Sequence, residues 1–220
     1  MSKLLRIGVL ASGSGTNLQS IIDRCQDGSL DAEIAVVICN NPDAGALTRA
    51  AQAGIATRCI NHRDFTRRED FDTAAVSALQ DAGVELVVLA GFMRIITQTF
   101  IDAFPSRVIN IHPALLPAFP GLHVQQQAID YGARFSGCTV HFVDGGVDTG
   151  PILIQAVVPI LQDDTAETLA ARILEQEHRI YPRAIQLIAE KRVHVNGRQI
   201  TIDPACQPDP AALVNPALED

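Results

Sequence analysis

The sequence contains no apolar run of the roughly 20 residues that a membrane-spanning helix needs, and its start, MSKLLRIGVLAS, shows no signal peptide. It also has no excess of basic residues: 17 lysines and arginines stand against 25 aspartates and glutamates, which gives a net charge of −8. Because nucleic-acid affinity depends on clustered Lys and Arg, this charge disfavours a nucleic-acid partner. We therefore expect a cytoplasmic protein that binds neither membrane nor nucleic acid.

The sequence has no Cys-x-x-Cys pair, no internal repeat and no low-complexity linker. Its cysteines are odd in number and scattered, which is typical of free thiols in a reducing compartment. They are Cys25, Cys39, Cys59, Cys138 and Cys206. The length of 220 residues, with 47% hydrophobic and 19% charged residues, suits one globular domain. We predict a single domain over residues 1–203 and a Pro-rich tail over 204–220.

Short runs rich in Val, Ile and Leu alternate with longer amphipathic stretches along the first half of the chain. The runs that predict strands are 5–11, 34–39, 56–60, 86–90 and 108–112. Fully apolar strands such as LVVLA are typical of a parallel sheet that helices cover on both faces. The predicted fold class is therefore α/β, with a doubly wound, mostly parallel sheet and a Rossmann-type N-terminal half.

The pattern changes in the second half of the chain. CTVHFV, the loop DGGVDTG and PILIQAVVPI predict two strands that extend the same sheet in antiparallel fashion. A long C-terminal helix is expected from about Thr165, with Asp164 three residues before Glu167 as an N-cap arrangement. Pro182 should bend or interrupt this helix. HVNGRQI then predicts a small hairpin.

A glycine-rich run, SGSGTNL at residues 12–18, lies between a predicted strand and a predicted helix. Backbone amides near Gly15, Thr16 and Asn17 can converge there on an anion at the helix N-terminus. The alternative is that a tight turn simply needs glycine. A dinucleotide fingerprint would have a small residue in place of Leu18, and a nucleotide P-loop would have a Lys. The run therefore fits a small phosphorylated substrate better than NAD or ATP.

A pair of polar residues ends the fifth predicted strand, in VINIHPALLPAFPG. Asn110 and His112 are two residues apart and share one face, while Ile109 and Ile111 pack the other. Pro113 ends the strand, which puts the pair at the carboxyl edge of the sheet, where open α/β folds bind ligands. The alternative is a core histidine satisfied by hydrogen bonds. The adjacent Asn and the loop that follows favour a functional site.

Two carboxylates are further candidates for a site. Asp148 lies in GGVDTGP, whose glycines let the backbone bend sharply, so its carboxylate can approach His112 and favour the charged imidazole. The alternative is a solvated turn residue. Glu177 falls on the apolar stripe of the last helix, between Ile173 and Ile180. Because an unpaired buried charge is costly, Glu177 either snorkels outward or hydrogen-bonds a ligand or a buried cation.

Taken together, these residues resemble those of the phosphoribosylglycinamide formyltransferase family of de novo purine (IMP) synthesis. The resemblance spans essentially residues 5–200 and rests on SGSGTNLQ, VVLAGFMRI, NIHPALLPAFPGLH, GGVDTGPI and QEHRIYP, in that order. It implies transfer of the formyl group of 10-formyltetrahydrofolate, as co-substrate, to the amino group of glycinamide ribonucleotide. The products would be the N2-formyl compound and tetrahydrofolate. It further implies an enzyme without a metal, as a monomer or homodimer.

The resemblance also implies residue roles, position by position. The implied catalytic residues are Asn110, His112 and Asp148. The residues implied for the substrate phosphate and ribose are Gly15, Thr16, Asn17 and Glu177. Those implied for the folate are Met93, Arg94, Ile95, Ile96 and Asn110, with Arg68 near the glutamate tail. The sequence departs from the family pattern after Leu122, where HVQQQ lacks a second His and a basic residue, so the role of His123 is left open.

The implied mechanism begins with attack of the substrate amine on the formyl carbon. Asn110 and protonated His112 would supply donors to the oxyanion, and Asp148 would sustain the charge and help relay the proton.

Four alternatives remain open. A formyltetrahydrofolate deformylase uses the same three residues, but usually with an extra N-terminal domain, and this chain starts at the first strand. A methionyl-tRNA formyltransferase would need a nucleic-acid-binding domain. A metal hydrolase built on His112, His141 and Asp148 and a non-catalytic binding protein are the other two.

Overall fold

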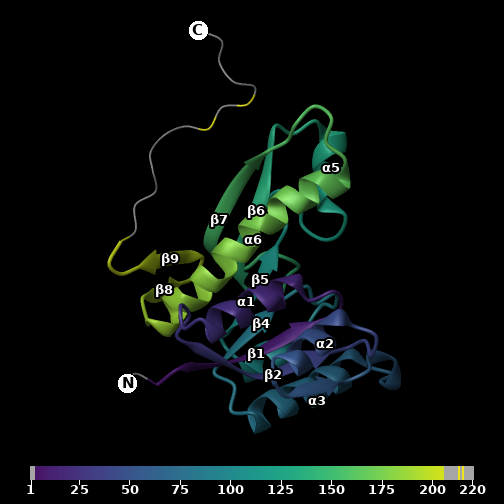
Figure 1. Cartoon of the computed structure of the whole chain (residues 1–220), viewed down its shortest axis with the longest axis vertical. Helices are drawn as coiled ribbons and strands as arrows, with labels where there is room; N and C mark the ends of the chain where they lie inside the picture. Colours follow the sequence, from purple (N-terminus) through teal and green to yellow (C-terminus); the bar gives the residue numbers. More distant parts are fainter. Residues whose placement is uncertain (1–2, 206–212, 214, 216–220) are drawn as a thin grey trace.

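A seven-stranded sheet forms the centre of the computed structural model, which describes residues 3–205, 213 and 215 (Figure 1). Its strands are β1 (Leu5–Ala11), β2 (Ala32–Cys39), β3 (Thr57–Cys59), β4 (Leu86–Leu89), β5 (Val108–His112), β6 (Phe135–Phe142) and β7 (Ile152–Pro159). Their order across the sheet is β3-β2-β1-β4-β5-β6-β7. The first five strands are parallel, whereas β6 and β7 are antiparallel to their neighbours. The predicted mixed α/β sheet is thus confirmed.

Helices cover both faces of this sheet. The helices of one face are α1 (Thr16–Gln26), α2 (Gly45–Gln52), α5 (Val124–Tyr131) and α6 (Ala166–Ala189). Those of the other face are α3 (Arg68–Asp81) and α4 (Gln98–Ala103), with the short 3-10 helix η1 (His62–Asp64) preceding α3. The long helix α6 lies across β6 and β7 and also contacts α1 (Figure 1). The doubly wound arrangement follows from strands that are apolar on both faces.

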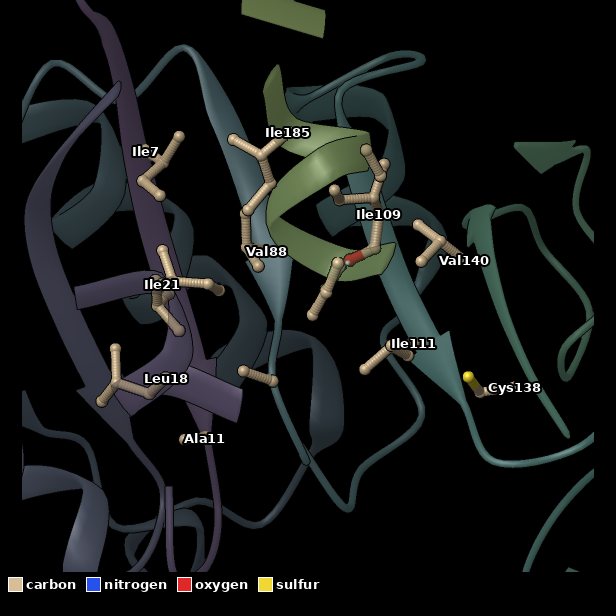
Figure 2. Packing of buried hydrophobic residues seen from close by; sticks show 14 of the residues in the cluster. Ile7, Ala11, Leu18, Ile21, Val88, Ile109, Ile111, Cys138, Val140 and Ile185 are labelled. Atoms are coloured by element: carbon tan, nitrogen blue, oxygen red, sulfur yellow. Dashed lines mark hydrogen bonds between the residues drawn. The ribbon is translucent and has the colours of Figure 1, made fainter. Parts of the chain in front are cut away.

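Alternating side chains of β1, β2, β4 and β5 enter two separate hydrophobic clusters. In β5, Ile109 and Ile111 point to the side of Ile185 on α6 (Figure 2), whereas Val108 packs with α3 and α4. Full burial of such aliphatic side chains contributes about 1.5–3 kcal/mol each, which fixes the position of β5 between the layers. The hydroxyl of Tyr181 on α6 reaches the Leu89 carbonyl oxygen at 2.9 Å, so the helix is also held by a polar contact.

The strand order reverses between β1 and β4, because the chain moves from β1 toward β3 and then returns to build the other half of the sheet. The loops after β1 and β4 therefore meet at the carboxyl edge. The backbone N–H of Ser12 donates to the Gly91 carbonyl at 3.1 Å. Such a topological switch point is the usual ligand-binding place in open α/β sheets.

The N-cap expected for the last helix is wrong. Its N-cap is Thr165, which exchanges side-chain and backbone hydrogen bonds with Thr168, and not Asp164 with Glu167. The Asp164 carboxylate is instead occupied by Arg172 at 2.7 Å. Pro182 does not interrupt α6, which continues to Ala189. A proline removes only one backbone donor, and buried side chains on both sides of it keep the helix in place.

The remaining described elements follow the sequence pattern. Strands β8 (Val193–Asn196) and β9 (Gln199–Ile202) form the predicted hairpin around Gly197, whose φ is 58°. The predicted tail and Cys206 lie for the most part outside the described residues, and the other four cysteines are free thiols. No helix in the described part of the chain combines the length and the apolar character needed to cross a membrane.

Candidate active site

A cavity of about 660 Å³ opens at the carboxyl ends of β4 and β5. Three loops surround these strand ends: residues 91–96 after β4, residues 121–125 at the start of α5, and residues 143–148 after β6. Its size falls in the range of small-molecule sites. The cavity therefore lies at the sheet edge that the position of Pro113 predicts for a site.

Asn110 and His112 line this cavity from one face of β5, as the period of a strand requires. The neighbouring antiparallel strand β6 places His141 directly beside Asn110 in register. The Asn110 Nδ2 atom lies 3.3 Å from His141 Nε2, and His141 Nδ1 lies 2.8 Å from the Phe142 carbonyl oxygen. Two adjacent strands thus bring an amide and two imidazoles to one end of the cavity.

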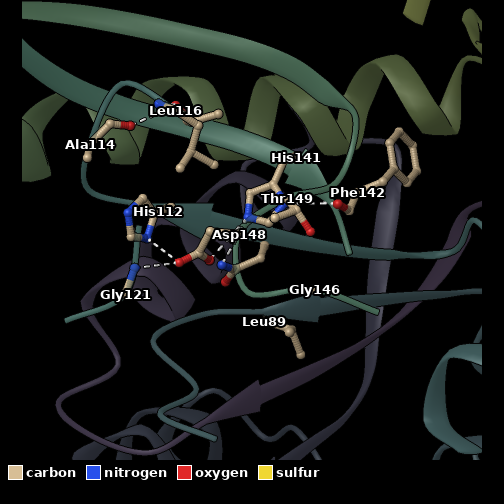
Figure 3. Close-up of polar contacts among 12 residues, drawn as sticks. Leu89, His112, Ala114, Leu116, Gly121, His141, Phe142, Gly146, Asp148 and Thr149 are labelled. Atoms are coloured by element: carbon tan, nitrogen blue, oxygen red, sulfur yellow. Dashed lines mark hydrogen bonds and ion pairs between the residues drawn. The ribbon is translucent and has the colours of Figure 1, made fainter. Parts of the chain in front are cut away.

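Asp148 reaches the same point from the loop between β6 and β7 (Figure 3). Its Oδ2 atom accepts a hydrogen bond from the Gly121 N–H at 2.9 Å and lies 3.3 Å from His112 Nδ1. Its Oδ1 atom lies 3.6 Å from His141 Nε2. The residue has a φ of 53°, in the left-handed region that Asp and Asn tolerate better than most residues. Asp148 is therefore no solvated turn residue.

The contacts of His112 constrain where its ring carries hydrogen. The Nε2 atom lies 2.8 Å from the carbonyl oxygen of Phe119, which can only accept, so Nε2 bears a hydrogen. The Nδ1 atom faces the Asp148 carboxylate, which is attractive only when Nδ1 bears a hydrogen as well. His112 is only 4% exposed, and both of its ring nitrogens contact polar groups of the protein.

The environment of Asp148 keeps its carboxyl ionised. Partial burial raises the pKa of this group, but the contact with His141, the hydrogen bond from Gly121 and the charge of His112 together outweigh burial. The pKa of Asp148 therefore lies below its ordinary value. A carboxylate beside an imidazolium is suited to holding a proton donor in place near neutral pH.

The sequence of this chain is similar to those of known proteins, and this similarity shows its family. Residues 5–185 match the model of the family described as "Formyl transferase". The chain is 44% identical to the phosphoribosylglycinamide formyltransferase of Haemophilus influenzae, over 90% of this chain and 93% of that protein. The chain belongs to the phosphoribosylglycinamide formyltransferase family.

Other members of this phosphoribosylglycinamide formyltransferase family include longer proteins. The chain is 49% identical to the trifunctional purine biosynthetic protein adenosine-3 of Drosophila melanogaster over 83% of its own length, but it spans only 14% of that relative. Among solved structures, glycinamide ribonucleotide transformylase 1 of Symbiobacterium toebii is 51% identical, with a TM-score of 0.90 over 92% of this chain and 95% of that one. The fold is thus shared over nearly the whole described chain.

Glu177 and Asn17 form a buried polar pair in this phosphoribosylglycinamide formyltransferase family member. Asn17 Nδ2 donates to Glu177 Oε2 at 2.7 Å, and Glu177 is only 6% exposed. Burial raises the pKa of the Glu177 carboxyl, and the Asn17 hydrogen bond opposes that shift only in part. The Asn17 Oδ1 atom is buried and has no hydrogen-bond partner among the described residues. The outward, snorkelling position of Glu177 is therefore not adopted.

The glycine-rich loop before α1 leaves the helix N-terminus open. Gly15 has a φ of 75°, and a Cβ atom at this position would lie 2.7 Å from the Cα atom of Ala46. The turn therefore does need glycine. The first turn, beginning at Thr16, has no side-chain cap and no acidic residue, so its backbone amides remain uncapped among the described residues.

The segment after β4 supplies one wall of the cavity. Its residues that line the cavity are Gly91, Phe92, Met93, Arg94, Ile95 and Ile96. The guanidinium of Arg94 lies 5.1 Å from the ring centroid of Phe71 on α3. Arg68 does not line the cavity; it is the first residue of α3, three positions before Phe71 on the helix. Only Arg94 of these two arginines is shown in contact with the Phe71 ring.

Sequence reasoning overlooked the residues that support the catalytic cluster. Thr139 is fully buried beside His112; its hydroxyl donates to the Ala114 carbonyl at 2.7 Å and accepts from the Leu116 N–H at 3.1 Å. These bonds fix the loop that carries Phe119 back to His112. The sequence CTVHFV did carry a signal for this residue. Thr139 and His141 are two residues apart, so they share one face of their strand, as Asn110 and His112 do on the neighbouring strand.

Two further observations concern the remaining predictions. His123 and Gln125, the residues at the start of the altered HVQQQ segment, both line the cavity. Across the described residues, no three His, Cys, Asp or Glu side chains gather in an arrangement that could hold a metal ion.

Proposed function

We propose that this chain transfers the formyl group of 10-formyltetrahydrofolate to the amino group of N1-(5-phospho-D-ribosyl)glycinamide. The products are the N2-formyl compound and tetrahydrofolate, in de novo purine biosynthesis. The observation that carries the proposal is the convergence of Asn110, His112 and Asp148 on one end of a ligand-sized cavity, in a chain of the phosphoribosylglycinamide formyltransferase family. The full-length similarity to single-function relatives supports the same reaction.

In the proposed reaction, the neutral amine of the ribonucleotide attacks the formyl carbon, and a tetrahedral intermediate with an oxyanion forms. The Asn110 amide has two hydrogens, and at least one of them is available to the oxyanion. The charged ring of His112 adds electrostatic stabilisation. Release of its Nε2–H from the Phe119 carbonyl would give the oxyanion a second donor.

Collapse of the intermediate breaks the bond between the formyl carbon and N10 of the folate. The attacking nitrogen must lose a proton, and N10 must gain one. Asp148 is ionised and lies beside His112, so its carboxylate accepts the amine proton, and the proton passes to N10 directly or through water. No covalent intermediate with the enzyme is required, and the proposal includes no metal.

The ribonucleotide is proposed to bind between α1 and α6. Its phosphate would accept hydrogen bonds from the backbone amides of Gly15, Thr16 and Asn17, because an uncapped helix N-terminus favours anions. Its ribose hydroxyls would donate to Glu177, and the unpartnered oxygen of Asn17 offers a further acceptor. A substrate hydroxyl would thereby satisfy a buried atom that has no partner now.

The folate is proposed to occupy the cavity along the wall formed by Met93, Arg94, Ile95 and Ile96, with Asn110 at its inner end. Met93 and Ile95 are 66% and 57% exposed, which is costly for apolar side chains unless a ligand covers them. Arg94 lines the cavity beside the Phe71 ring, and Arg68 is proposed to lie near the far end of the folate, as the first residue of α3. They suit the carboxylates of the glutamate tail.

The test is folate absorbance after the protein is mixed with 10-formyltetrahydrofolate in EDTA, with and without the ribonucleotide. We expect deformylation only when the ribonucleotide is present. Equal deformylation without it would identify a hydrolase and overturn the proposal. Loss of activity in EDTA that is restored by a divalent cation would contradict the absence of a metal.

A further inference from the structure

The segment 90–96, which forms the proposed folate wall, contains no helix and no strand. It therefore lacks the hydrogen-bond ladder that fixes the position of a regular element, and its position depends on a few contacts with its neighbours. Contacts with two regions of the described chain hold it: the end of β1 and the loop after it, through Leu10 and Ser12, and the pair Phe71 and Asp72 on α3.

The Ser12 contact holds the first half of the segment. The backbone N–H of Met93 donates to Ser12 Oγ at 2.8 Å, and this hydroxyl donates in turn to Asn40 Oδ1 at 2.6 Å. Phe71 adds two ring contacts, since it stacks on Phe92 with centroids 6.3 Å apart and lies beneath the Arg94 guanidinium.

Asp72 holds the other end. Its Oδ2 atom accepts a hydrogen bond of 2.6 Å from the backbone N–H of Thr97, which directly follows the wall residue Ile96 and is the N-cap of α4. Asp72 is only 2% exposed, although it lies on the apolar side of α3 with Ala75 and Leu79. The Thr97 hydroxyl is also buried but has no hydrogen-bond partner among the described residues, so Asp72 contacts Thr97 through its backbone N–H.

We propose that Asp72 is a positioning residue for the formyl transfer: its buried carboxylate fixes the Thr97 end of the segment and so sets the wall against which the folate binds. Burying a carboxylate on the apolar face of a helix is costly unless the carboxylate makes a hydrogen bond that an apolar side chain cannot make. Asp72 accepts a hydrogen bond from the backbone N–H of Thr97, which has no partner within a helix or strand. Thr97 directly follows the residues that line the cavity. This inference rests on the proposed folate-binding role of the cavity.

The first measurement separates binding from chemistry. In Asp72→Ala, we expect the KM for 10-formyltetrahydrofolate to rise about tenfold, as loss of a hydrogen bond to a charged group predicts. The kcat at saturating folate and the KM for the ribonucleotide should stay within about twofold, because neither reacting group touches Asp72. Asp72→Asn keeps an oxygen acceptor for the Thr97 N–H and should recover most of the folate KM.

Two controls distinguish positioning from general destabilisation. Asp70→Ala removes an exposed carboxylate from the same helix and should leave the folate KM unchanged. Ala78→Gly weakens α3 at a buried position away from the segment and should lower Tm without changing the folate KM. A rise in folate KM with Ala78→Gly that matches Asp72→Ala would show that only stability is involved, and would overturn the inference.

Amide hydrogen exchange of residues 92–97 without ligand provides a test that does not depend on the proposed function. We expect faster exchange there in Asp72→Ala than in the wild type, and wild-type rates in Asp70→Ala. Unchanged exchange in Asp72→Ala would overturn the positioning role, even if the enzyme is active. If the wild type neither binds nor deformylates the folate, the proposed function fails, while the exchange experiment still decides whether Asp72 fixes the segment.

Discussion

The side-chain amide of Asn17 donates to the carboxylate of Glu177 across the interface between α1 and α6, at 2.7 Å. The pair is buried, and burial raises the pKa of Glu177. A carboxyl group with a raised pKa in the folded state stabilises the fold below its unfolded pKa, and this contribution is lost as pH rises through the folded pKa. Raising the pH above the unfolded pKa therefore makes Glu177 a cost to stability, which the proposed ribose-binding role explains.

Glu177→Gln should consequently stabilise the protein and impair binding. The Gln oxygen still accepts from Asn17, but no charge is buried, so we expect Tm at pH 7 to rise by a few degrees and the KM for the ribonucleotide to rise. The gain in Tm should vanish below about pH 4, where the carboxyl is protonated in both states. Calorimetry at several pH values checks this, and a lower Tm for the variant at pH 7 would contradict it.

Asp148→Asn should fold and bind the ribonucleotide but lose most turnover. Asn tolerates the left-handed backbone of this position, so the loop should keep its shape. Without the carboxylate, the charge of His112 and the proton acceptor are both lost, and we expect kcat to fall about 10²- to 10⁴-fold. Steady-state kinetics with a ribonucleotide-binding measurement provides the check, and near-normal kcat would refute the assignment.

The lowered pKa of Asp148 also predicts that stability depends on pH, in the opposite direction to the dependence expected from Glu177. A depressed folded pKa contributes stability that is present above the unfolded pKa and is lost as pH falls through the folded pKa. The wild type should therefore be more stable than Asp148→Asn at neutral pH, and the difference should shrink at acid pH. Denaturant titrations at pH 7 and pH 3 test this, and a difference that grows at pH 3 would contradict it.

His141→Leu should lower kcat by about tenfold, because both Asn110 and Asp148 lose the ring that lies between them. His141→Gln, which offers a polar group of similar reach, should recover part of that loss. Both variants should keep the ribonucleotide KM of the wild type. Equal activity of His141→Leu and the wild type would remove this residue from the catalytic cluster.

Gly15→Ala should be far more damaging than Gly13→Ala. Position 15 has a positive φ and a Cβ clash with Ala46, whereas a Cβ at position 13 meets nothing within 4 Å. We expect Gly15→Ala to lose at least about 2 kcal/mol of unfolding free energy and much of its ribonucleotide affinity. Denaturant unfolding of both variants is the measurement, and equal losses would mean that the turn does not depend on this glycine.

Local patterns were sufficient for much of the fold and for half of the catalytic cluster. Asn110 and His112 share a face because the strand period is two, which a sequence reveals without any tertiary information. The approach of Asp148 depends on a loop that returns from β6; the glycines of GGVDTGP made this approach possible, but did not distinguish it from a solvated turn residue. The cap of α6 was mispredicted because the choice between Asp164 and Thr165 depends on Arg172, which takes the carboxylate.

Asp72 gave the same kind of signal as Glu177, a carboxylate on the apolar side of a helix, yet no motif drew attention to it. Its partner is a backbone N–H in a segment without regular structure, and no periodicity predicts where such a segment passes. His141 similarly became part of the site only through the register of β5 and β6. Contacts of this kind between distant segments are the part that the sequence pattern did not reveal.

Ser12 belongs to the loop that leads into α1, which is proposed to hold the phosphate. Its hydroxyl accepts a hydrogen bond from the N–H of Met93, in the wall that is proposed to hold the folate. This single hydroxyl thus connects the two proposed sites. If the ligands bind as proposed, both would contact loops that this hydrogen bond connects. Thermodynamic linkage then imposes reciprocity: whatever factor the ribonucleotide applies to the affinity for the folate, the folate must apply to the affinity for the ribonucleotide. A Ser12→Ala variant gives direct access to that coupling free energy.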